Sequence, residues 1–214
     1  MCNIPMNKTR PLQSLSQILS GLPSGKLYKS KADNSLDARL INADAITHTE
    51  TLNEEKIKKV WIDEATPKKF FLRDKDIIVT LRGSRFKSTI FHCKKTQNLF
   101  TTSSNNAIIR CDQNIIAPEI LNFFLNTDWF RASVIYKTQS NLVLINLKAL
   151  KNLDIPVPGL GQQSRLIKQY YCAQELQKAT LDLITAQNSA IETKFLAQYL
   201  QQADNLPSLN ERDS

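Results

Sequence analysis

The C-terminal part of the chain contains a long stretch without a helix-breaking residue. The segment LDIPVPGLGQQSRLIKQYY, residues 153–171, places two prolines and two glycines within nine residues, and neither type recurs before Pro207. From Gln162 to about Gln202 nothing interrupts a helix, and at 1.5 Å per residue forty residues make a rod of roughly 60 Å. We therefore expect one helix that is much longer than a typical globular helix.

An apolar stripe follows this expected helix in steps of three and four residues. Its members are Leu166, Tyr170, Ala173, Gln177, Leu181, Ile184, Asn188, Ile191 and Phe195. Gln177 and Asn188 are polar interruptions of the kind that coiled-coil seams contain. A helix of this length cannot bury the stripe against itself, so we predict that it pairs with a helix of a second chain. The alternative is a core helix packed on its own domain.

The net charge of +8 is unevenly distributed along the chain. Residues 1–160 contain 23 Lys and Arg against 14 Asp and Glu, whereas residues 161–214 contain five against six. Within the first region, residues 77–111 include six basic residues and no acid. A domain with such a positive field most often binds a polyphosphate, so nucleic acid is the first candidate partner. A solubilising basic face is the alternative.

Length and composition limit the class of protein. With 214 residues, 42% of them apolar, we expect one ordinary domain plus an appendage, or two small domains. The chain has no run of 18 apolar residues, and its start, MCNIPMNKTRPLQ, lacks the apolar core of a signal peptide. We therefore expect a cytoplasmic protein that crosses no membrane. The four cysteines form no C-x-x-C pair, so we expect reduced thiols, no metal site and no cofactor.

Six runs rich in β-branched and aromatic residues predict strands, and they precede the strong helix signals. They are residues 36–46, 69–72, 76–81, 86–93, 99–102 and 107–111. This order favours an antiparallel or barrel-like sheet over βαβ units. The segment LNEEKIKKVW, residues 52–61, is expected to interrupt the strands as a short helix. The sequence thus predicts an α+β fold that ends in one long coiled-coil-type helix.

Signals for short helices begin at residue 117. Pro118 and Glu119 suit the first turn of a helix in APEILNFFLN, and Asp128 is expected to cap a second helix in DWFRASVIY. Asn146 is expected to cap a single turn, LKALK. The chain then straightens into LDIPVP, because a residue that precedes proline is pushed out of the helical region.

No sequence motif predicts catalysis. The chain has neither a G-x-x-x-x-G-K-[ST] loop nor a G-x-G-x-x-G loop, and it lacks the Pro-Pro pair that amino-methyltransferase motifs contain. Glu192 and Lys194 have the E-x-K spacing of some nucleases but lie on the long helix without an acid cluster, so we interpret them as a solvated pair. His48 and His92 have no nucleophile partner that spacing can assign. We therefore expect a protein that is not an enzyme.

Taken together, these segments resemble the DNA specificity (S) subunits of type I restriction–modification systems, in particular one target recognition domain followed by one conserved-region helix. The resemblance covers residues 12 to about 200 and is carried by LSQILSG (15–21), FLRDKDIIVTLRGS (71–84), IAPEILNFFLNT (116–127) and LKALKNLDIPVPGLGQQSRLIKQY (147–170). Such subunits usually begin the long helix with Glu-Gln, whereas this chain has Gln162-Gln163. They usually have Gly-Asp before a strand, whereas this chain has Lys75-Asp76. Full S subunits look like two tandem copies of this unit, and this sequence shows no internal repeat.

The resemblance implies a domain organisation and a set of partners. Residues 1–160 correspond to the target recognition domain, 161–203 to the conserved-region helix and 204–214 to a flexible tail. In this family the recognition domain reads one half of a bipartite sequence in double-stranded DNA, and the S subunit has no catalytic site. Paired antiparallel helices set the distance between the halves and dock methyltransferase (M) subunits, which work with a restriction (R) subunit.

A half-length chain is therefore expected to form a homodimer through residues 162–202, with the apolar stripe as its interface. Its DNA target is then expected to be an inverted repeat with a fixed spacer, because the symmetry of the protein is mirrored in the site.

Three polar clusters are candidate DNA contacts. Lys and Arg mainly bind phosphates, whereas Asn, Gln, Ser and well-placed Arg read base edges. The first cluster is Arg82, Ser84, Arg85 and Lys87, with Lys94 and Lys95 one hairpin later; the second is Lys137, Gln139 and Asn141; the third is Lys26, Lys29 and Lys31. Asn105 and Asn106 are weaker candidates, because asparagine pairs often make turns. Two other functions stay open: a coiled-coil interaction protein that binds restriction or methyltransferase subunits without reading DNA, and a nuclease without a known motif.

Overall fold

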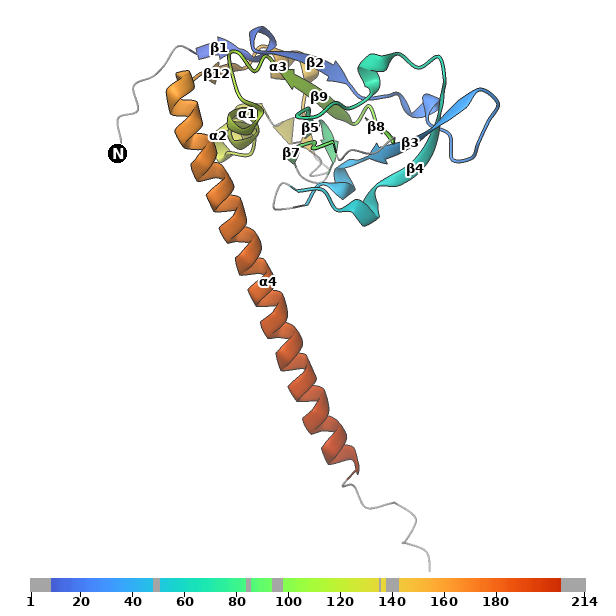
Figure 1. Ribbon diagram of the computed structural model, residues 1–214, viewed down its shortest axis with the longest axis vertical. Helices are drawn as coiled ribbons and strands as arrows, with labels where there is room; N and C mark the ends of the chain where they lie inside the picture. Colours follow the sequence, from blue (N-terminus) through green and yellow to red (C-terminus); the bar gives the residue numbers. More distant parts are fainter. Residues whose placement is uncertain are drawn as a thin grey trace, which may run out of the picture. The chain divides into compact units, whose positions relative to one another are not determined.

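The computed structural model describes residues 9–47, 51–83, 86–93, 98–134, 136–137 and 143–204 (Figure 1). The chain divides into two compact units, Met1–Tyr170 and Tyr171–Ser214. We refer to the first unit as the head and to the second as the helical unit.

The described strands form four sheets, which are mostly antiparallel. The central sheet has the order β2 (Ser16–Ser20), β9 (Asn106–Cys111), β5 (Ile77–Thr80), β7 (Ser88–Ile90). In the second sheet, β3 (Ser35–Ile41) lies between antiparallel β4 (Lys58–Asp63) and parallel β8 (Leu99–Thr102). The two smaller sheets are β10 (Tyr136–Lys137), β11 (Val143–Leu144), β6 (Arg82–Gly83), and the pair β1 (Thr9–Pro11), β12 (Asp154–Pro156). None of these four closes into a barrel, so the predicted α+β class is confirmed in its antiparallel form.

Four α-helices accompany the sheets in the described part of the chain. They are α1 (Pro118–Leu125), α2 (Asp128–Val134), α3 (Leu147–Lys151) and α4 (Leu160–Asp204). The amide oxygen of Asn146 accepts a hydrogen bond from the Lys148 N–H over 2.8 Å, which confirms the predicted cap of α3. No described helix combines the length and the apolar character that a membrane span requires.

The central sheet is buried on both faces, which explains the unbroken apolar run at its middle strand. Ile77 and Val79 of β5 belong to a core that contains residues of α1, α2 and α3. Ile78 points the other way and packs with Ile41 and Phe91 in a second core. A strand with two covered faces needs apolar residues at consecutive positions rather than at every second one.

Two segments differ from the sequence prediction. The segment 52–61 is not a helix: only a short 3₁₀ turn, Glu54–Lys56, precedes strand β4. Residues 69–72 are not a regular strand either, because a 3₁₀ turn, Lys68–Phe70, follows Pro67 and leaves a single bridge between Phe71 and Thr101. In the first segment the backbone of residues 58–61 pairs with β3 instead of forming helical hydrogen bonds, and in the second only one bridge forms.

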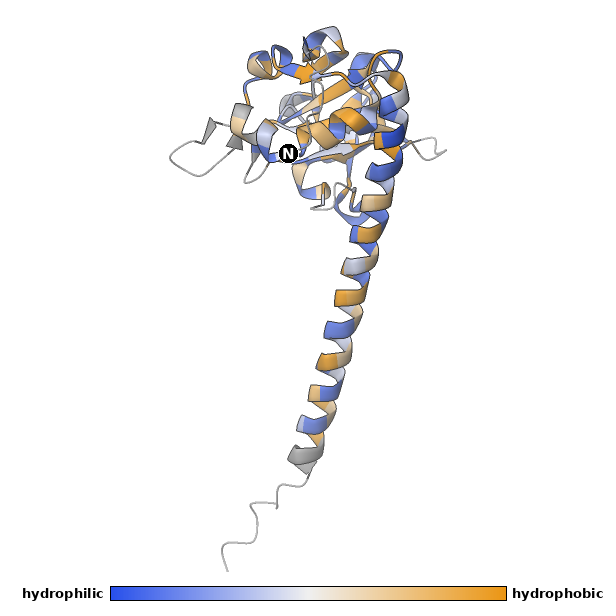
Figure 2. Ribbon diagram, turned by 90° about the vertical axis from the view of Figure 1, so that its left-hand side faces the viewer, coloured by the Kyte–Doolittle hydropathy of each residue, from blue (hydrophilic) through white to orange (hydrophobic). Residues whose placement is uncertain are grey.

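The long helix α4 begins inside the head and is one continuous element, as predicted. Its first backbone hydrogen bonds run from the N–H groups of Gln162 and Gln163 to the Gly159 carbonyl, both over 2.9 Å. Its first turns are packed, because Leu166 and Ile167 contact the main core of the head. Hydrophobic residues recur along the coloured part of this helix (Figure 2).

Candidate nucleic-acid interface

A buried ion pair holds the scaffold of the head together. The Asp76 carboxylate accepts hydrogen bonds from the Arg110 guanidinium, with distances of 3.0 Å and 3.2 Å from Nε. It also accepts one from the Arg73 N–H over 2.8 Å. Burial raises the pKa of the Asp76 carboxyl, and the hydrogen bonds from Arg110 and Arg73 oppose that rise. Arg110 lies in the acid-free stretch of the sequence, but its guanidinium pairs with Asp76 inside the fold and does not add to the positive charge of the surface.

One residue of each of the first two predicted clusters, Arg82 and Lys137, lies in the same small sheet. Strand β11 lies between β6 and β10, so that Leu144 pairs with both Arg82 and Tyr136. In the same way Val143 pairs with both Gly83 and Lys137. Arg82 and Lys137, which are 55 positions apart in the sequence, therefore lie on the two outer strands of a single three-stranded sheet.

A cleft of about 440 Å³ with a mixed polar and apolar lining adjoins this sheet. Its described lining consists of Ser20, Leu81, Arg82, Ser104, Asn105 and residues 144–147. Arg82 is the only charged residue in that lining, and its side chain is exposed. The arrangement offers a cation together with neutral amide and hydroxyl groups, which are the groups that bind phosphates and base edges.

The turn between β8 and β9 forms one wall of the cleft. The Asn105 carbonyl accepts hydrogen bonds from the N–H groups of Leu81 (2.8 Å) and Arg82 (3.1 Å). The Asn106 amide is buried and donates to the Thr102 hydroxyl over 2.6 Å. The asparagine pair thus makes a turn, as its sequence suggests, and this turn also exposes Ser104 and Asn105 at the cleft. The run TTSSNN between two apolar strands is the sequence signal for this wall.

The other members of the first cluster are placed differently. Lys87 is half-buried, and its ammonium group donates a hydrogen bond to the Ile46 carbonyl over 2.6 Å, so it helps to hold the head together. Ser84, Arg85, Lys94 and Lys95 lie outside the described residues, as do Gln139 and Asn141 of the second cluster.

The third cluster lies beside the edge strand β4. Lys26, Lys29 and Lys31 are all exposed. The backbones of Tyr28 and Trp61 exchange two hydrogen bonds of 2.8 Å and 2.9 Å, which ties this segment to β4. The Lys31 ammonium lies 5.9 Å from the centre of the Trp61 ring. A cation over an aromatic ring is held in a defined position, so Lys31 is the best-placed cation of this cluster.

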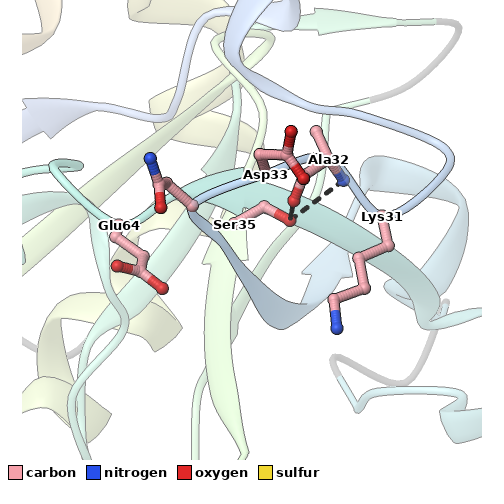
Figure 3. A pocket seen from close by; sticks show the side chains of 6 residues that line it. Lys31, Ala32, Asp33, Ser35 and Glu64 are labelled. Atoms are coloured by element: carbon pink, nitrogen blue, oxygen red, sulfur yellow. Dashed lines mark hydrogen bonds between the residues drawn. The ribbon is translucent and has the colours of Figure 1, made fainter.

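A second hollow, of about 420 Å³, is lined in part by Lys31 (Figure 3). Its lining includes the carboxylates of Asp33 and Glu64, which point away from the Lys31 ammonium. Ser35 closes the turn here, because its hydroxyl donates to the Ala32 carbonyl and accepts from the Ala32 N–H over 3.1 Å. Two carboxylates repel phosphate, so this hollow is not part of the candidate interface.

The members of the apolar stripe fall into two groups. Leu166 is half-buried and Tyr170 is 9% exposed, because both pack on the head. The Tyr170 hydroxyl accepts a hydrogen bond from the Asn122 amide over 3.0 Å. The remaining seven members, in the helical unit, are exposed: Ala173, Gln177, Leu181, Ile184, Asn188, Ile191 and Phe195.

The described residues contain no cluster of His, Cys, Asp or Glu that could hold a metal ion. The cysteines among them, Cys93, Cys111 and Cys172, form no disulfide.

Comparison with known proteins relates this chain to solved structures. No family model matches it, and no curated protein matches it. A chain from a structure on complex assembly and conformational transition of the type I restriction–modification system is 17% identical, with a TM-score of 0.59 over 95% of this chain and 45% of that one.

Two further structures agree with this result. The HsdS subunit from Thermoanaerobacter tengcongensis is 17% identical, with a TM-score of 0.55 over 85% of this chain and 40% of that one. The S subunit of a type I restriction–modification system from M. genitalium is 16% identical, with a TM-score of 0.51 over 95% and 51% of the two chains. This chain therefore has the fold of type I restriction–modification S subunits and spans about half their length.

Proposed function

We propose that the chain is a sequence-specific DNA recognition subunit of a type I restriction–modification system, and that its head reads one half of a bipartite target in double-stranded DNA. The observation that carries this proposal is the fold shared with S subunits, combined with the positive surplus of residues 1–160. The cleft beside β6 and β11, with Arg82, Ser104 and Asn105, is the proposed reading site. Lys137, Lys26, Lys29 and Lys31 are proposed phosphate contacts, together with Arg85, Lys94 and Lys95.

The second part of the proposal concerns assembly. Two copies pair through α4, which then holds two heads at a fixed separation. The large apolar side chains of the helical unit support this pairing: Leu181, Ile184, Ile191 and Phe195 are 45%, 46%, 64% and 67% exposed. Side chains of this kind rarely stay exposed as a contiguous row in a monomer. Methyltransferase (M) subunits are proposed to dock on the paired helices and to recruit the restriction (R) subunit, so that the chain itself is not catalytic.

Selection from random double-stranded oligonucleotides tests the reading function. The expected product is an inverted repeat with a spacer of constant length, because a two-fold dimer reads both half-sites alike. Recovery of a methyltransferase by the chain, without any enriched DNA sequence, would instead indicate a coiled-coil interaction protein. Magnesium-dependent cleavage by the purified chain alone would indicate a nuclease.

Salt dependence tests the phosphate contacts. For each phosphate contact, the slope of log affinity against log salt concentration is expected to be about −0.9. Arg82→Ala is expected to weaken binding by about tenfold and to make the slope shallower by about one unit if Arg82 binds a phosphate. Lys178→Ala, an exposed cation of the helical unit, is the matched control and is expected to change neither quantity. Equal effects of the two substitutions would contradict the proposed site.

The mass of the purified protein in solution tests the assembly. A dimer is expected, and replacement of both Ile184 and Ile191 by Glu is expected to give a monomer that stays folded. The control is Gln187→Glu, at an exposed position outside the stripe, which is expected to leave the dimer intact. A wild-type monomer at micromolar concentration would contradict this part of the proposal.

A further inference from the structure

Two side chains at the tip of the turn between β8 and β9 are exposed, although their backbone is held by neighbouring segments. The Asn106 N–H donates to the Ser103 carbonyl over 2.9 Å, which closes the turn. The Ser104 N–H donates to the Leu22 carbonyl over 2.8 Å, and the Asn105 carbonyl accepts from two N–H groups at the junction of β5 and β6. The backbone of Ser104 and Asn105 is therefore fixed, while both side chains face solvent.

The turn does not need an asparagine at position 105. Asparagine serves turns either by adopting a left-handed backbone or by bonding its side chain to the backbone nearby. Among the described residues, the non-glycine positions with positive φ are Asn34 and Lys75, so Asn105 is not left-handed. Its amide makes no hydrogen bond with any described residue. Both amide groups of Asn105 are therefore available to a ligand, whereas the Asn106 amide is buried and bonded to Thr102.

We propose that Asn105 reads an adenine in the major groove through both groups of its amide. This inference rests on the proposed reading function of the head, and it adds a base and the residue that recognises it. An amide offers a donor and an acceptor side by side. Adenine presents the complementary pair in the major groove, with N7 as the acceptor and the N6 amino group as the donor. Guanine presents two acceptors there, thymine an acceptor and a methyl group, and cytosine a donor alone.

The other groups of the cleft fit an adenine beside a phosphate. The described lining contains no carboxylate, the group that would accept from the N4 amino group of cytosine. Within that lining Arg82 is the only cation. Its N–H donates to the Asn105 carbonyl over 3.1 Å, so the two residues adjoin. Arg82 then binds a phosphate that flanks the adenine, while Asn105 contacts the edge of the base.

A close approach of two backbones holds the turn in place. The Gly21 N–H donates to the Asn106 carbonyl over 3.0 Å, and a Cβ at Gly21 would overlap the Ser103 carbonyl. The turn therefore lies directly against the end of β2. A reading residue on such a fixed backbone has less conformational freedom to lose on binding than one on a long loop. This preorganisation makes Asn105 a specificity-determining residue.

Selection from random double-stranded oligonucleotides, with the full-length wild type and with Asn105→Ala, tests the assignment. The wild type is expected to enrich a half-site with an adenine at one position, and Asn105→Ala is expected to lose the preference at that position. Its affinity for the wild-type target is expected to fall about tenfold or more, because a bidentate base contact is lost. The salt dependence of binding is expected to stay unchanged, because the substitution removes no charge.

Replacement of the base identifies the contact. With 7-deazaadenine at that position, which lacks the N7 acceptor, binding of the wild type is expected to weaken about fivefold or more, while binding of Asn105→Ala stays the same. Asn105→Asp keeps the shape of the side chain but offers acceptors alone, so its preference is expected to shift to cytosine. Gln113→Ala, at an exposed position in the turn that follows β9, is the matched control and is expected to keep the wild-type preference and affinity.

The outcomes separate this assignment from the reading function itself. A wild type that enriches no sequence overturns the proposed function, and the assignment with it. If Asn105→Ala keeps every preference of the wild type, the assignment alone is wrong and the head still reads DNA. A position that depends on Asn105 but prefers another base, or a wild type that tolerates 7-deazaadenine, overturns the choice of adenine.

The melting temperature of Asn105→Ala shows whether the asparagine serves the turn instead. It is expected to match that of the wild type, because backbone groups hold the turn. A large drop, or a failure to fold, would mean that the turn itself needs the asparagine and would overturn the assignment.

Discussion

Gln163 supplies the hydrogen bond that Ala117 needs at the start of helix α1: its Oε1 accepts from the Ala117 N–H over 2.9 Å. Ala117 is the residue before the first turn of α1 and has no side-chain group of its own to serve as a cap. The Gln163 amide also donates to the carbonyls of Ile115 (2.9 Å) and Pro158 (2.8 Å), and the residue is 3% exposed. One side chain of α4 therefore fixes the position at which both helices begin.

Gln163→Leu is expected to destabilise the head by about 2–4 kcal/mol, because three partly buried backbone groups lose their partner at once. Gln169→Leu, at an exposed position six residues later on the same helix, is expected to stay within about 0.5 kcal/mol of the wild type. Chemical denaturation followed by circular dichroism measures both. Similar values for the two variants would contradict the role assigned to Gln163.

Arg110→Leu is expected to cost about 3–5 kcal/mol at neutral pH, because it leaves the Asp76 carboxylate buried without its ion pair. Adding Asp76→Asn to this variant is expected to recover part of the loss, since the second change removes the buried charge. Thermal denaturation of the two variants checks the order of their stabilities.

The pH dependence of the Arg110→Leu variant follows from the sign of the Asp76 shift. Burial raises the pKa of Asp76 in the fold above its ordinary value of 3.8, so the fold binds this proton more tightly than the unfolded chain does. The contribution of Asp76 to the free energy of unfolding has its full value below pH 3.8 and declines as the pH rises through the folded-state pKa. Loss of Arg110 raises that pKa further. The difference in stability between the wild type and the Arg110→Leu variant is therefore expected to shrink on acidification. A difference that grows would contradict this account.

Lys75→Gly is expected to stabilise the head by up to about 1 kcal/mol. Lys75 has φ = 66°, a left-handed conformation that glycine adopts without steric cost and lysine does not. Asn34→Gly is the comparison, at φ = 55°, and is expected to gain less because asparagine tolerates this region better. Urea titration of both variants measures the difference, and a destabilised Lys75→Gly variant would contradict the prediction.

Gly21→Ala is expected to cost about 3 kcal/mol or more, or to prevent folding. A Cβ at Gly21 would overlap the backbone carbonyl of Ser103, which cannot move without breaking the turn between β8 and β9. Gly25→Ala is the matched control, because nothing lies within 4 Å of the Cβ position there. Soluble yield and melting temperature of the two variants, compared side by side, check this prediction.

The elements that could be predicted from the sequence are those that depend on local chemistry. The long helix follows from the absence of breaking residues after Gly161, and the cap of α3 follows from Asn146. Glu and Lys in segment 52–61 favour a helix, but Val60 and Ile62 pack in a core on one face and their backbone pairs with β3, so a strand forms. A strand that forms because it pairs with a distant segment cannot be recognised from its own residues alone.

The candidate site depended even more on distant residues. The residue types of Arg82 and Lys137 suggested DNA contact, but only the pairing of β11 with both β6 and β10 places them on one sheet. Periodicity placed Tyr170 in the stripe, and it carries no information about which surface covers that position. The structure adds that Phe123 and Asn122 of the same chain contact Tyr170.

Strands β1 and β12 pair as Arg10 with Ile155, so the two ends of the segment 12–153 lie side by side, shortly before α4 begins. The segment between these two strands, which contains the other sheets and helices α1 to α3, therefore begins and ends at one place. If the head reads DNA as proposed, we expect that residues 12–153, transplanted as a single block into a relative of the same fold, would carry their own sequence preference with them and leave the host's half-site spacing untouched. Evolution of new specificity would then need no redesign of the assembly.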